Sequence, residues 1–390
     1  EFSYSRCNRL IGDELSKDTI KQILSSLEIE IVQETEDTLS LKVPTYRVDV
    51  QRECDVIEEI LRIYGFNSVP IPVSLKSSII VSKGIPQEKI VKVISNLLVS
   101  NGFNEIMNNS LTRKEYYTNL EETLEENHVE LLNPLSQDLN ILRRNLLFGG
   151  LENIARNNNM KNPNLKFFEF GKTYFKNAEG DYQEEKNLSL FVTGLKTENS
   201  WSTEPVGVSI YTLKGYVSSI ISRLGISKIK TKTVQNEFLS EGLAIYSKKT
   251  LIAEYGKVKQ KFLKSTGVKQ DVYFANIKWD EVLQLLKYQK TKLSPISKFH
   301  PVKRDLSLLL NDTINYSDLE QIAFEVERKI LKKVELFDIY QGSKLPEGKK
   351  SYALSFILQS DESTLKDKQI ENTMQKLQKA FQDKLGAELR

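Results

Sequence analysis

Residues 334–359, VELFDIYQGSKLPEGKKSYALSFILQ, decide the fold of the last quarter of the chain. Runs rich in apolar and aromatic residues at both ends of this stretch flank a segment of Gly, Pro and Lys, which predicts two strands joined by a hairpin. A strand at 303–310 and a helix at 316–332 precede the stretch, and a helix at 365–386 and the closing residues AELR follow it. This order, β-α-β-β-α-β, predicts a ferredoxin-like sheet with two helices on one face.

Side chains that alternate along the first strand of this hairpin fall on two faces of the sheet. Because Phe337 and Ile339 are apolar, we expect them to face the helices, which leaves Asp338 and Tyr340 on the open face, with Ser351 at the start of the neighbouring strand. RRM domains stack bases on such a face; a carboxylate can accept hydrogen bonds from guanine, and a tyrosine can stack. The alternative is that Asp338 and Ser351 are merely solvated and Tyr340 packs at the sheet edge.

The composition is that of an ordinary soluble protein, with 390 residues, 39% hydrophobic and 27% charged. No apolar run approaches the ~18 residues of a membrane span, and no signal peptide opens the chain. Two cysteines and two histidines are too few for a disulfide framework or a four-ligand zinc site. We therefore expect a cytoplasmic protein without a membrane segment. The formal net charge is +3, although the first 72 residues carry 14 acidic against 8 basic side chains.

The periodicity of apolar residues, together with the prolines and glycines that interrupt it, predicts a multidomain α+β chain. Its blocks lie at 1–72, 73–293 and 294–390. The first block combines a helix at 16–29, a strand at 38–44 and an acidic helix, and it ends in a proline-containing linker. These signals predict a small helix and strand domain.

The middle block alternates helices and strands. Helix patterns at 86–103, 142–159 and 211–225 alternate with strand patterns at 165–175 and 188–193. The sequence contains no GxGxxG, Walker or HExxH motif. Local motifs therefore give no support for catalysis.

Four acids crowd into PTYRVDVQRECDVIEEILRIYGFNSVP at 44–70, namely Asp49, Asp55, Glu58 and Glu59. Asp55 followed by Glu58 imitates a capping box, acids in a first turn favour the helix dipole, and Glu58 with Arg62 makes an i,i+4 ion pair. That explanation leaves out Asp49 and Glu59. Four hard oxygen donors would also suit Mg²⁺, so from the residues alone a helix cap and a metal site both remain open.

Three separated motifs occur in order along the chain: VPTYRVDVQRECDVIEEILRIYGFNSVP at 43–70, LLNPLSQDLNILRRNLLFGGLENIARNNN at 131–159 with LKFFEFGKTY at 165–174, and SKFHPVKRDLSLLL from 297 with the hairpin above, TLKDKQI and LGAELR. Together they resemble the β subunit of bacterial phenylalanyl-tRNA synthetases. The match runs end to end and covers the C-terminal half of such a subunit.

The resemblance implies a small nucleic-acid-binding-fold domain with a magnesium site over 1–72, a catalytically inactive class II synthetase-like antiparallel-sheet core over 73–293, and a ferredoxin-fold anticodon-binding domain over 294–390. It also implies membership of phenylalanine–tRNA ligase, an ATP-dependent enzyme whose active site lies in the α subunit. The chain would scaffold that subunit in an α2β2 heterotetramer and bind the anticodon of tRNA(Phe).

The resemblance further assigns individual residues. The magnesium-binding acids of the family match Asp49, Asp55, Glu58 and Glu59. The partner subunit would complete the coordination of the ion. The anticodon contacts match Asp338, Tyr340 and Ser351. Lys303 and Arg304, beside the first strand of that domain, could contact phosphate.

The core departs from the pattern of class II active sites, which carry an Arg-x-Glu strand and a Gly-rich strand ending in Glu-Arg. Phe167 stands where the arginine would be, and no Gly-rich Glu-Arg stretch is present. Arg143 and Arg144 alone could equally be surface or interface residues. We therefore expect a scaffold that is inactive by itself. The rival hypotheses are a stand-alone RNA-binding protein with an RRM-like domain and an independent ligase that uses the middle block.

Overall fold

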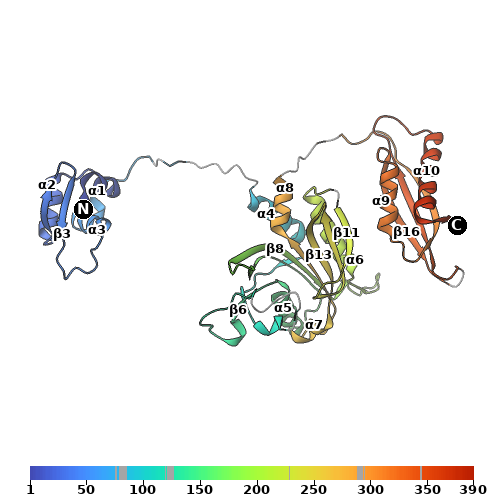
Figure 1. Cartoon of the computed structure of the whole chain (residues 1–390), viewed down its shortest axis with the longest axis horizontal. Coiled ribbons are helices and arrows are strands. Elements are labelled where there is room, and N and C mark those ends of the chain that lie inside the picture. The colour runs from blue at the N-terminus through green and yellow to red at the C-terminus, as the bar shows by residue number, and fades with distance from the viewer. Residues whose placement is uncertain are drawn as a thin grey trace. The chain divides into compact units, whose positions relative to one another are not determined.

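The computed structural model describes residues 1–74, 77–78, 86–118, 120, 127–227, 229–287, 293, 295–342 and 345–390. The chain divides into two compact units, Glu1–Lys83 and Gly84–Arg390, and Figure 1 labels their elements. Parts of the expected hairpin turn and of the expected boundary at 293 lie outside the described residues. Among the described residues, no helix has the length and apolar content needed to cross a bilayer.

The N-terminal unit packs three helices around a small sheet of order β1-β3-β2. Its elements are β1 (Phe2–Ser3), α1 (Tyr4–Ile11), α2 (Lys17–Ser26), β2 (Glu30–Glu34), β3 (Thr38–Lys42), α3 (Glu53–Tyr64) and the 3-10 turn η1 (Phe66–Ser68). The expected helix and strand of this block are confirmed. The hydroxyl of Ser16 accepts from the Thr19 N–H at 3.1 Å and caps α2. Gly65, at φ 97°, ends α3.

The middle part is built on a sheet of order β11-β12-β13-β14-β8-β7-β4, antiparallel except for the β4–β7 pair. Its strands are β4 (Asn104–Glu105), β7 (Leu165–Lys176), β8 (Tyr182–Thr193), β11 (Ile229–Val234), β12 (Leu239–Ser247), β13 (Thr250–Val258) and β14 (Val272–Lys278). Two short ribbons accompany it, from β5 (Leu111–Thr112) with β6 (Ile141–Leu142) and from β9 (Leu195–Thr197) with β10 (Val206–Gly207). The antiparallel-sheet core expected for this block is therefore confirmed.

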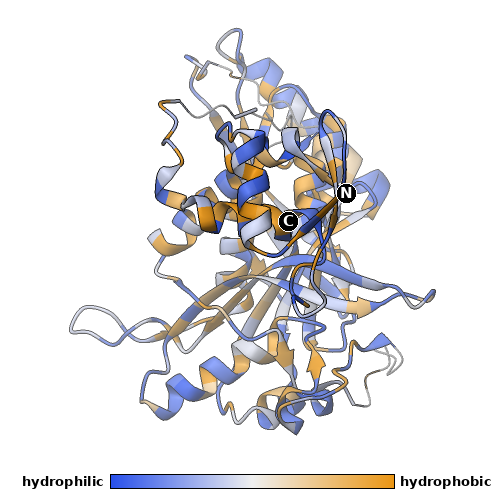
Figure 2. Cartoon of the chain, turned by 90° about the vertical axis from the view of Figure 1, so that its left-hand side faces the viewer, coloured by the Kyte–Doolittle hydropathy of each residue, from blue (hydrophilic) through white to orange (hydrophobic). Residues whose placement is uncertain are grey.

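Helices cover both faces of this sheet. Apolar residues of α4 (Gln87–Ser100), α6 (Ile210–Arg223) and α8 (Trp279–Lys287) pack into one core, and those of α5 (Leu147–Asn159) and α7 (Gln260–Ser265) into another. Along β8, Leu190 and Val192 enter the first core and Phe191 the second. This two-sided burial explains the unbroken apolar run of that strand. Figure 2 shows apolar and polar residues alternating along the helices.

The C-terminal part has the predicted β-α-β-β-α-β order. Its sheet, of order β16-β17-β15-β18, is covered on one face by two helices. The elements are β15 (Val302–Asn311), α9 (Tyr316–Val326), β16 (Leu331–Tyr340), β17 (Lys349–Leu358), α10 (Asp367–Leu385) and β18 (Glu388–Leu389). The ferredoxin-like fold is confirmed.

Two expected helices are shorter than their patterns indicated. The helix expected over 142–159 begins at Leu147, because residues 141–142 pair as β6. The helix expected over 316–332 ends at Val326. There the carboxylate of Glu327 accepts from the N–H groups of Lys329 and Ile330, at 2.8 and 3.1 Å. This turn leads the chain out of the helix and into β16.

Helix α5 approaches the sheet so closely that a glycine is needed at the contact. A Cβ added to Gly150 would lie 2.1 Å from the ring of Phe191, which is fully buried in β8. Gly215, in the exposed face of α6, meets nothing within 4 Å.

We predict that Gly150→Ala lowers the free energy of unfolding by about 1–3 kcal/mol, because an overpacked core must shift. The matched variant Gly215→Ala should leave stability unchanged or raise it, since alanine has the higher helix propensity. Chemical denaturation of both variants measures the difference, and an equally stable Gly150→Ala protein would show that this packing is wrong.

Candidate nucleic-acid interface and acidic helix

The register of β16 against β17 decides which side chains reach the open face of the C-terminal sheet. Opposite residues of an antiparallel pair share a face, and Leu336 and its partner Leu354 both pack in the core under the helices. After Leu336 the register shifts by one residue, which is a β-bulge. Asp338 and Tyr340 therefore pair with residues of β17 that point away from the core, Tyr340 with Ser351.

The expectation that Phe337 faces the helices is wrong, because its side chain is 57% exposed and lies beside a cation of the open face. Phe337 occupies the extra position of the bulge. Its ring centroid lies 5.7 Å from the Nζ atom of Lys303, whose partner in β17 is Ile357 on the open face. Ile339 pairs with Tyr352 on the helix side but remains half exposed. Strict alternation fails here because a bulge inserts one residue.

Tyr340 and Ser351 lie beside residues of the other two strands: Arg390, which follows the edge strand β18, and Ser307 on β15. The guanidinium carbon of Arg390 is 5.0 Å from the Tyr340 ring centroid, and the backbone N–H of Arg390 donates to the carbonyl of Ser307 at 3.1 Å. Ser351 is only 4% exposed, and its hydroxyl lies 3.4 Å from that of Ser307. The closing residues AELR predict only a strand from sequence, so the position of Arg390 appears only once β18 pairs with β15.

Arg304 does not join this group. In β15 it pairs with Phe356, which is fully buried under the helices, so its side chain leaves the strand on the helix side. Its neighbour Lys303 leaves on the open side. Contact between Arg304 and phosphate stays a prediction.

In the acidic helix, Asp55 turns back to the start of its own helix. Its Oδ2 atom accepts from the backbone N–H groups of Gln51 and Arg52, at 3.0 and 2.8 Å, and its Oδ1 atom is 3.1 Å from the Arg52 guanidinium. The side chain of Arg52 and these two N–H groups hold the pKa of Asp55 well below its usual range. Asp55 therefore acts as a helix cap in this structure.

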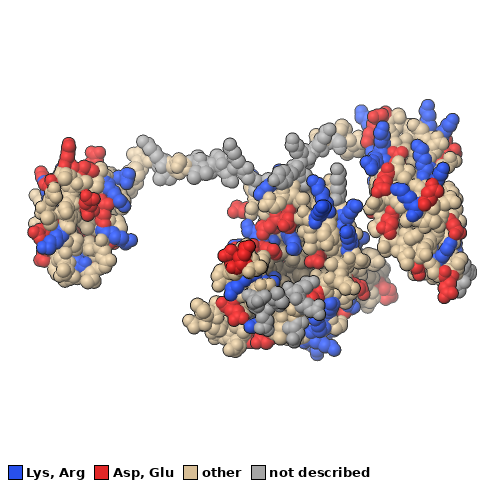
Figure 3. Space-filling view, in the orientation of Figure 1, with Lys and Arg blue, Asp and Glu red and all other residues tan. Residues whose placement is uncertain are grey.

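Asp49 and Glu59 meet at one arginine. An Nη atom of Arg47 lies 3.0 Å from Asp49 Oδ2 and 3.1 Å from Glu59 Oε1. Glu59 is nearly buried and also pairs with Arg62, which lowers its pKa, whereas Glu58 is exposed. The i,i+4 pair expected between Glu58 and Arg62 is thus replaced by an i,i+3 pair to Glu59. Figure 3 shows acidic and basic side chains interspersed over this unit.

As arranged here, the four acids do not fit a metal ion. Their oxygen atoms are of the right kind for Mg²⁺, but those of Asp49, Asp55 and Glu59 are engaged by arginines or backbone N–H groups. Within the described ranges, no group of three or more His, Cys, Asp or Glu side chains is arranged to hold a metal ion. The magnesium site therefore stays a prediction.

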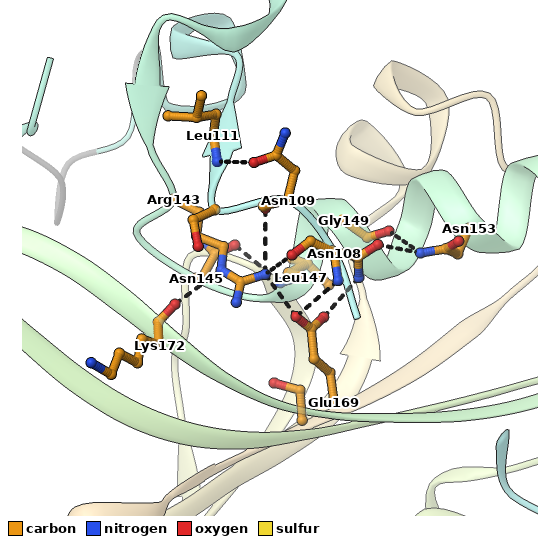
Figure 4. A network of polar contacts seen from close by, with 12 residues as sticks. Asn108, Asn109, Leu111, Arg143, Asn145, Leu147, Gly149, Asn153, Glu169 and Lys172 are labelled. Carbon is orange, nitrogen blue, oxygen red and sulfur yellow. Dashed lines mark hydrogen bonds and ion pairs between the residues drawn. The ribbon is translucent and has the colours of Figure 1, made fainter. Parts of the chain in front are cut away.

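The middle part contains a buried ion pair at the position of the missing catalytic pattern (Figure 4). Glu169, 1% exposed on β7, lies 2.7 Å from the Nη1 atom of Arg143, which is 7% exposed. Arg143 also donates to the carbonyl of Lys172 at 2.9 Å, and the side-chain amide of Asn108 donates to Glu169 at 2.7 Å. Arg143 is therefore a buried structural residue. A single acidic residue, Glu169, within the largely apolar strand LKFFEFG was the signal in the sequence.

Arg144 and Phe167 complete this comparison. Arg144 is partly buried and donates to the carbonyl of Asn127 at 3.1 Å, and burial lowers the pKa of its guanidinium. Phe167 packs in the core beneath α5. Phe167 offers no charged group to a triphosphate, and the guanidinium of Arg144 is already engaged by the carbonyl of Asn127.

We predict that Asp55→Ala weakens helix α3 and that Glu58→Ala leaves it nearly unchanged, since only Asp55 caps the helix. The folded pKa of Asp55 is lowered, so its contribution is present above its unfolded pKa of about 4 and is lost as the pH falls through the folded value. The difference between wild type and Asp55→Ala should therefore shrink below pH 4. Amide hydrogen exchange of α3 in the full chain, at several pH values, measures it. Equal exchange in both variants at pH 7 would contradict the cap.

Three family models match the chain in order. Residues 1–66 match the tRNA synthetase B5 domain, residues 71–279 the phenylalanyl tRNA synthetase beta chain CLM domain, and residues 297–390 the ferredoxin-fold anticodon binding domain.

Relatives agree with these matches. Over its full length the chain is 47% identical to the phenylalanine–tRNA ligase beta subunit of Bacteroides thetaiotaomicron, 39% to that of Porphyromonas gingivalis and 31% to that of Fusobacterium nucleatum, and each alignment covers 49% of the relative. The chain thus spans about half the length of the curated relatives that it matches.

A pyrrolysyl tRNA synthetase structure from Desulfitobacterium hafniense matches 70% of this chain and 90% of its own, with a TM-score of 0.41 and 12% identity. That likeness is too weak to support an argument. The beta chain model, by contrast, spans more than half of the sequence. The chain therefore belongs to the phenylalanyl-tRNA synthetase β-chain family.

Proposed function

We propose that this chain is part of the β subunit of a phenylalanine–tRNA ligase, which joins phenylalanine to its tRNA with ATP. In that complex the chain binds the anticodon of tRNA(Phe) and scaffolds the α subunit, which holds the active site. One observation carries the proposal: a family-matched anticodon-binding domain has an open sheet face on which a carboxylate and a tyrosine, Asp338 and Tyr340, lie side by side with a cation.

The chemistry of this face suits an unpaired guanine. An ionised carboxylate only accepts hydrogen bonds, and the N1 and N2 groups of guanine both donate. The Tyr340 ring offers a stacking surface. Ser351 lies opposite Tyr340 and is buried, so we propose that it supports the tyrosine rather than spanning the gap to a base.

The middle part acts as a scaffold in this proposal. Where class II active sites have Arg-x-Glu, this chain has a core phenylalanine and a glutamate that is already paired with Arg143. A carboxylate neutralised by a buried arginine is costly to release for another ligand. This observation disfavours an independent ligase built on the middle part, and the β-chain match over residues 71–279 disfavours a stand-alone RNA-binding protein.

Several finer expectations belong to the same proposal: an α2β2 assembly, a cytoplasmic location, domain boundaries near 72 and 293, and Mg²⁺ at Asp49, Asp55, Glu58 and Glu59. Because arginines engage Asp49, Asp55 and Glu59 in the chain described here, we propose that an ion binds only in the complex with the α subunit. Titration calorimetry with Mg²⁺ on the chain alone and on the complex tests this, and tight binding to the chain alone would contradict it.

We predict that Asp338→Ala and Tyr340→Ala, made in the reconstituted ligase, each raise the KM for tRNA(Phe) about tenfold or more. Tyr340→Ala loses stacking worth roughly 1–3 kcal/mol per base, and Asp338→Ala loses hydrogen bonds to a charged group, worth about 1.5–3 kcal/mol. Phenylalanine-dependent ATP–pyrophosphate exchange should be unchanged, since that step needs no anticodon. The control is Glu371→Gln, an exposed carboxylate on α10 at the helix-covered side. Unchanged aminoacylation kinetics in both test variants would remove these residues from the proposal.

A further inference from the structure

We propose that Phe337 stacks on a second base of the bound RNA, next to the base that meets Asp338 and Tyr340, and that Lys303 contacts the phosphate beside it. The inference rests on the proposed function, because it extends the same open face. It was not expected from the sequence, where Phe337 reads as a core residue.

The bulge turns the ring of Phe337 out of the core. Its side chain is 57% exposed, whereas Val334 and Leu336, earlier on the same strand, pack under the helices. An exposed phenylalanine adds little to folding, since apolar area stabilises only when it leaves water. A position that a bulge re-aims toward solvent instead offers a flat apolar surface for binding.

The charge beside this ring indicates the class of ligand. The ammonium of Lys303 lies 5.7 Å from the Phe337 ring centroid, and the guanidinium of Arg390 lies 5.0 Å from that of Tyr340. Covering such a cation with an apolar protein surface would cost its solvation. A partner with flat apolar faces can cover the rings, and an anionic backbone can keep the cations solvated by charge. Single-stranded RNA has this chemistry, and aromatic rings interleaved with cations are how proteins bind it.

The spacing assigns Phe337 and Tyr340 to different bases. Three positions separate them on β16, which corresponds to roughly 10 Å of regular strand and somewhat less across a bulge. That exceeds the ~3.4 Å between bases stacked on each other. Asp338 lies between the two rings in the chain. The open face therefore offers two stacking positions with a hydrogen-bond acceptor between them.

The test uses the full chain and a 17-nucleotide hairpin with the loop of tRNA(Phe), carrying 2-aminopurine at one loop position at a time. Phe337→Leu keeps an apolar side chain but removes the ring, and it should weaken binding about tenfold. It should also relieve the quenching of 2-aminopurine at a loop position other than the one relieved by Tyr340→Leu. Phe337→Trp should restore both readouts. Ile339→Ala, equally exposed on the same strand but on the helix side, is the matched control and should bind as wild type.

A second variant tests the cation independently of the ring. Lys303→Gln should lower the slope of log affinity against log salt by about one, as expected for one lost phosphate contact. Phe337→Leu binding within twofold of wild type, while Tyr340→Leu and Asp338→Ala bind weakly, would overturn the inference and leave the proposed function standing. If the wild-type chain prefers the hairpin no more than duplex RNA of equal charge, the proposed function fails and the inference falls with it.

Discussion

A strand that covers one core can bury only every second side chain, and the register shift after Leu336 decides what the C-terminal sheet presents on its other face. Without the shift, Asp338 and Tyr340 would share the face of Leu336 and lie under the helices. A carboxylate there would lose its hydration. With the shift, Leu336 stays in the core and both polar residues face outward. One bulge thus separates the residues that stabilise the domain from those that we propose bind RNA.

The other parts of the chain use their notable carboxylates internally. Asp55 caps its own helix, Glu59 is held by Arg47 and Arg62, and Glu169 is paired with Arg143. Each of these groups could suggest metal or nucleotide chemistry when read in isolation. Each of the three is held by partners within the chain, so none of them is free for a ligand in this structure. The open face of the C-terminal sheet is different. There, Lys303 and Arg390 lie beside the rings of Phe337 and Tyr340, and no carboxylate pairs with an arginine in the contacts described above.

The sequence predicts much of this architecture because its signals are local. The Ser16 cap, the glycine stop at Gly65 and the order of strands and helices in the last domain follow from residues a few positions apart. Features that depend on distant partners are missed. The bulge at Phe337 requires the pairing with β17, and the burial of Arg143 requires a glutamate 26 residues away. Arg390 reaches Tyr340 only because the end of the chain pairs with β15.

The central claim is that RNA binds the open face of the C-terminal sheet. Hydroxyl-radical footprinting of the α–β complex, with and without tRNA(Phe) and read by mass spectrometry, tests it most directly. The account predicts that bound tRNA protects Phe337 and Tyr340 from oxidation and leaves Tyr316, on the helix side at the start of α9, as reactive as before. Protection of Tyr316 with unchanged reactivity at Phe337 and Tyr340 would contradict it.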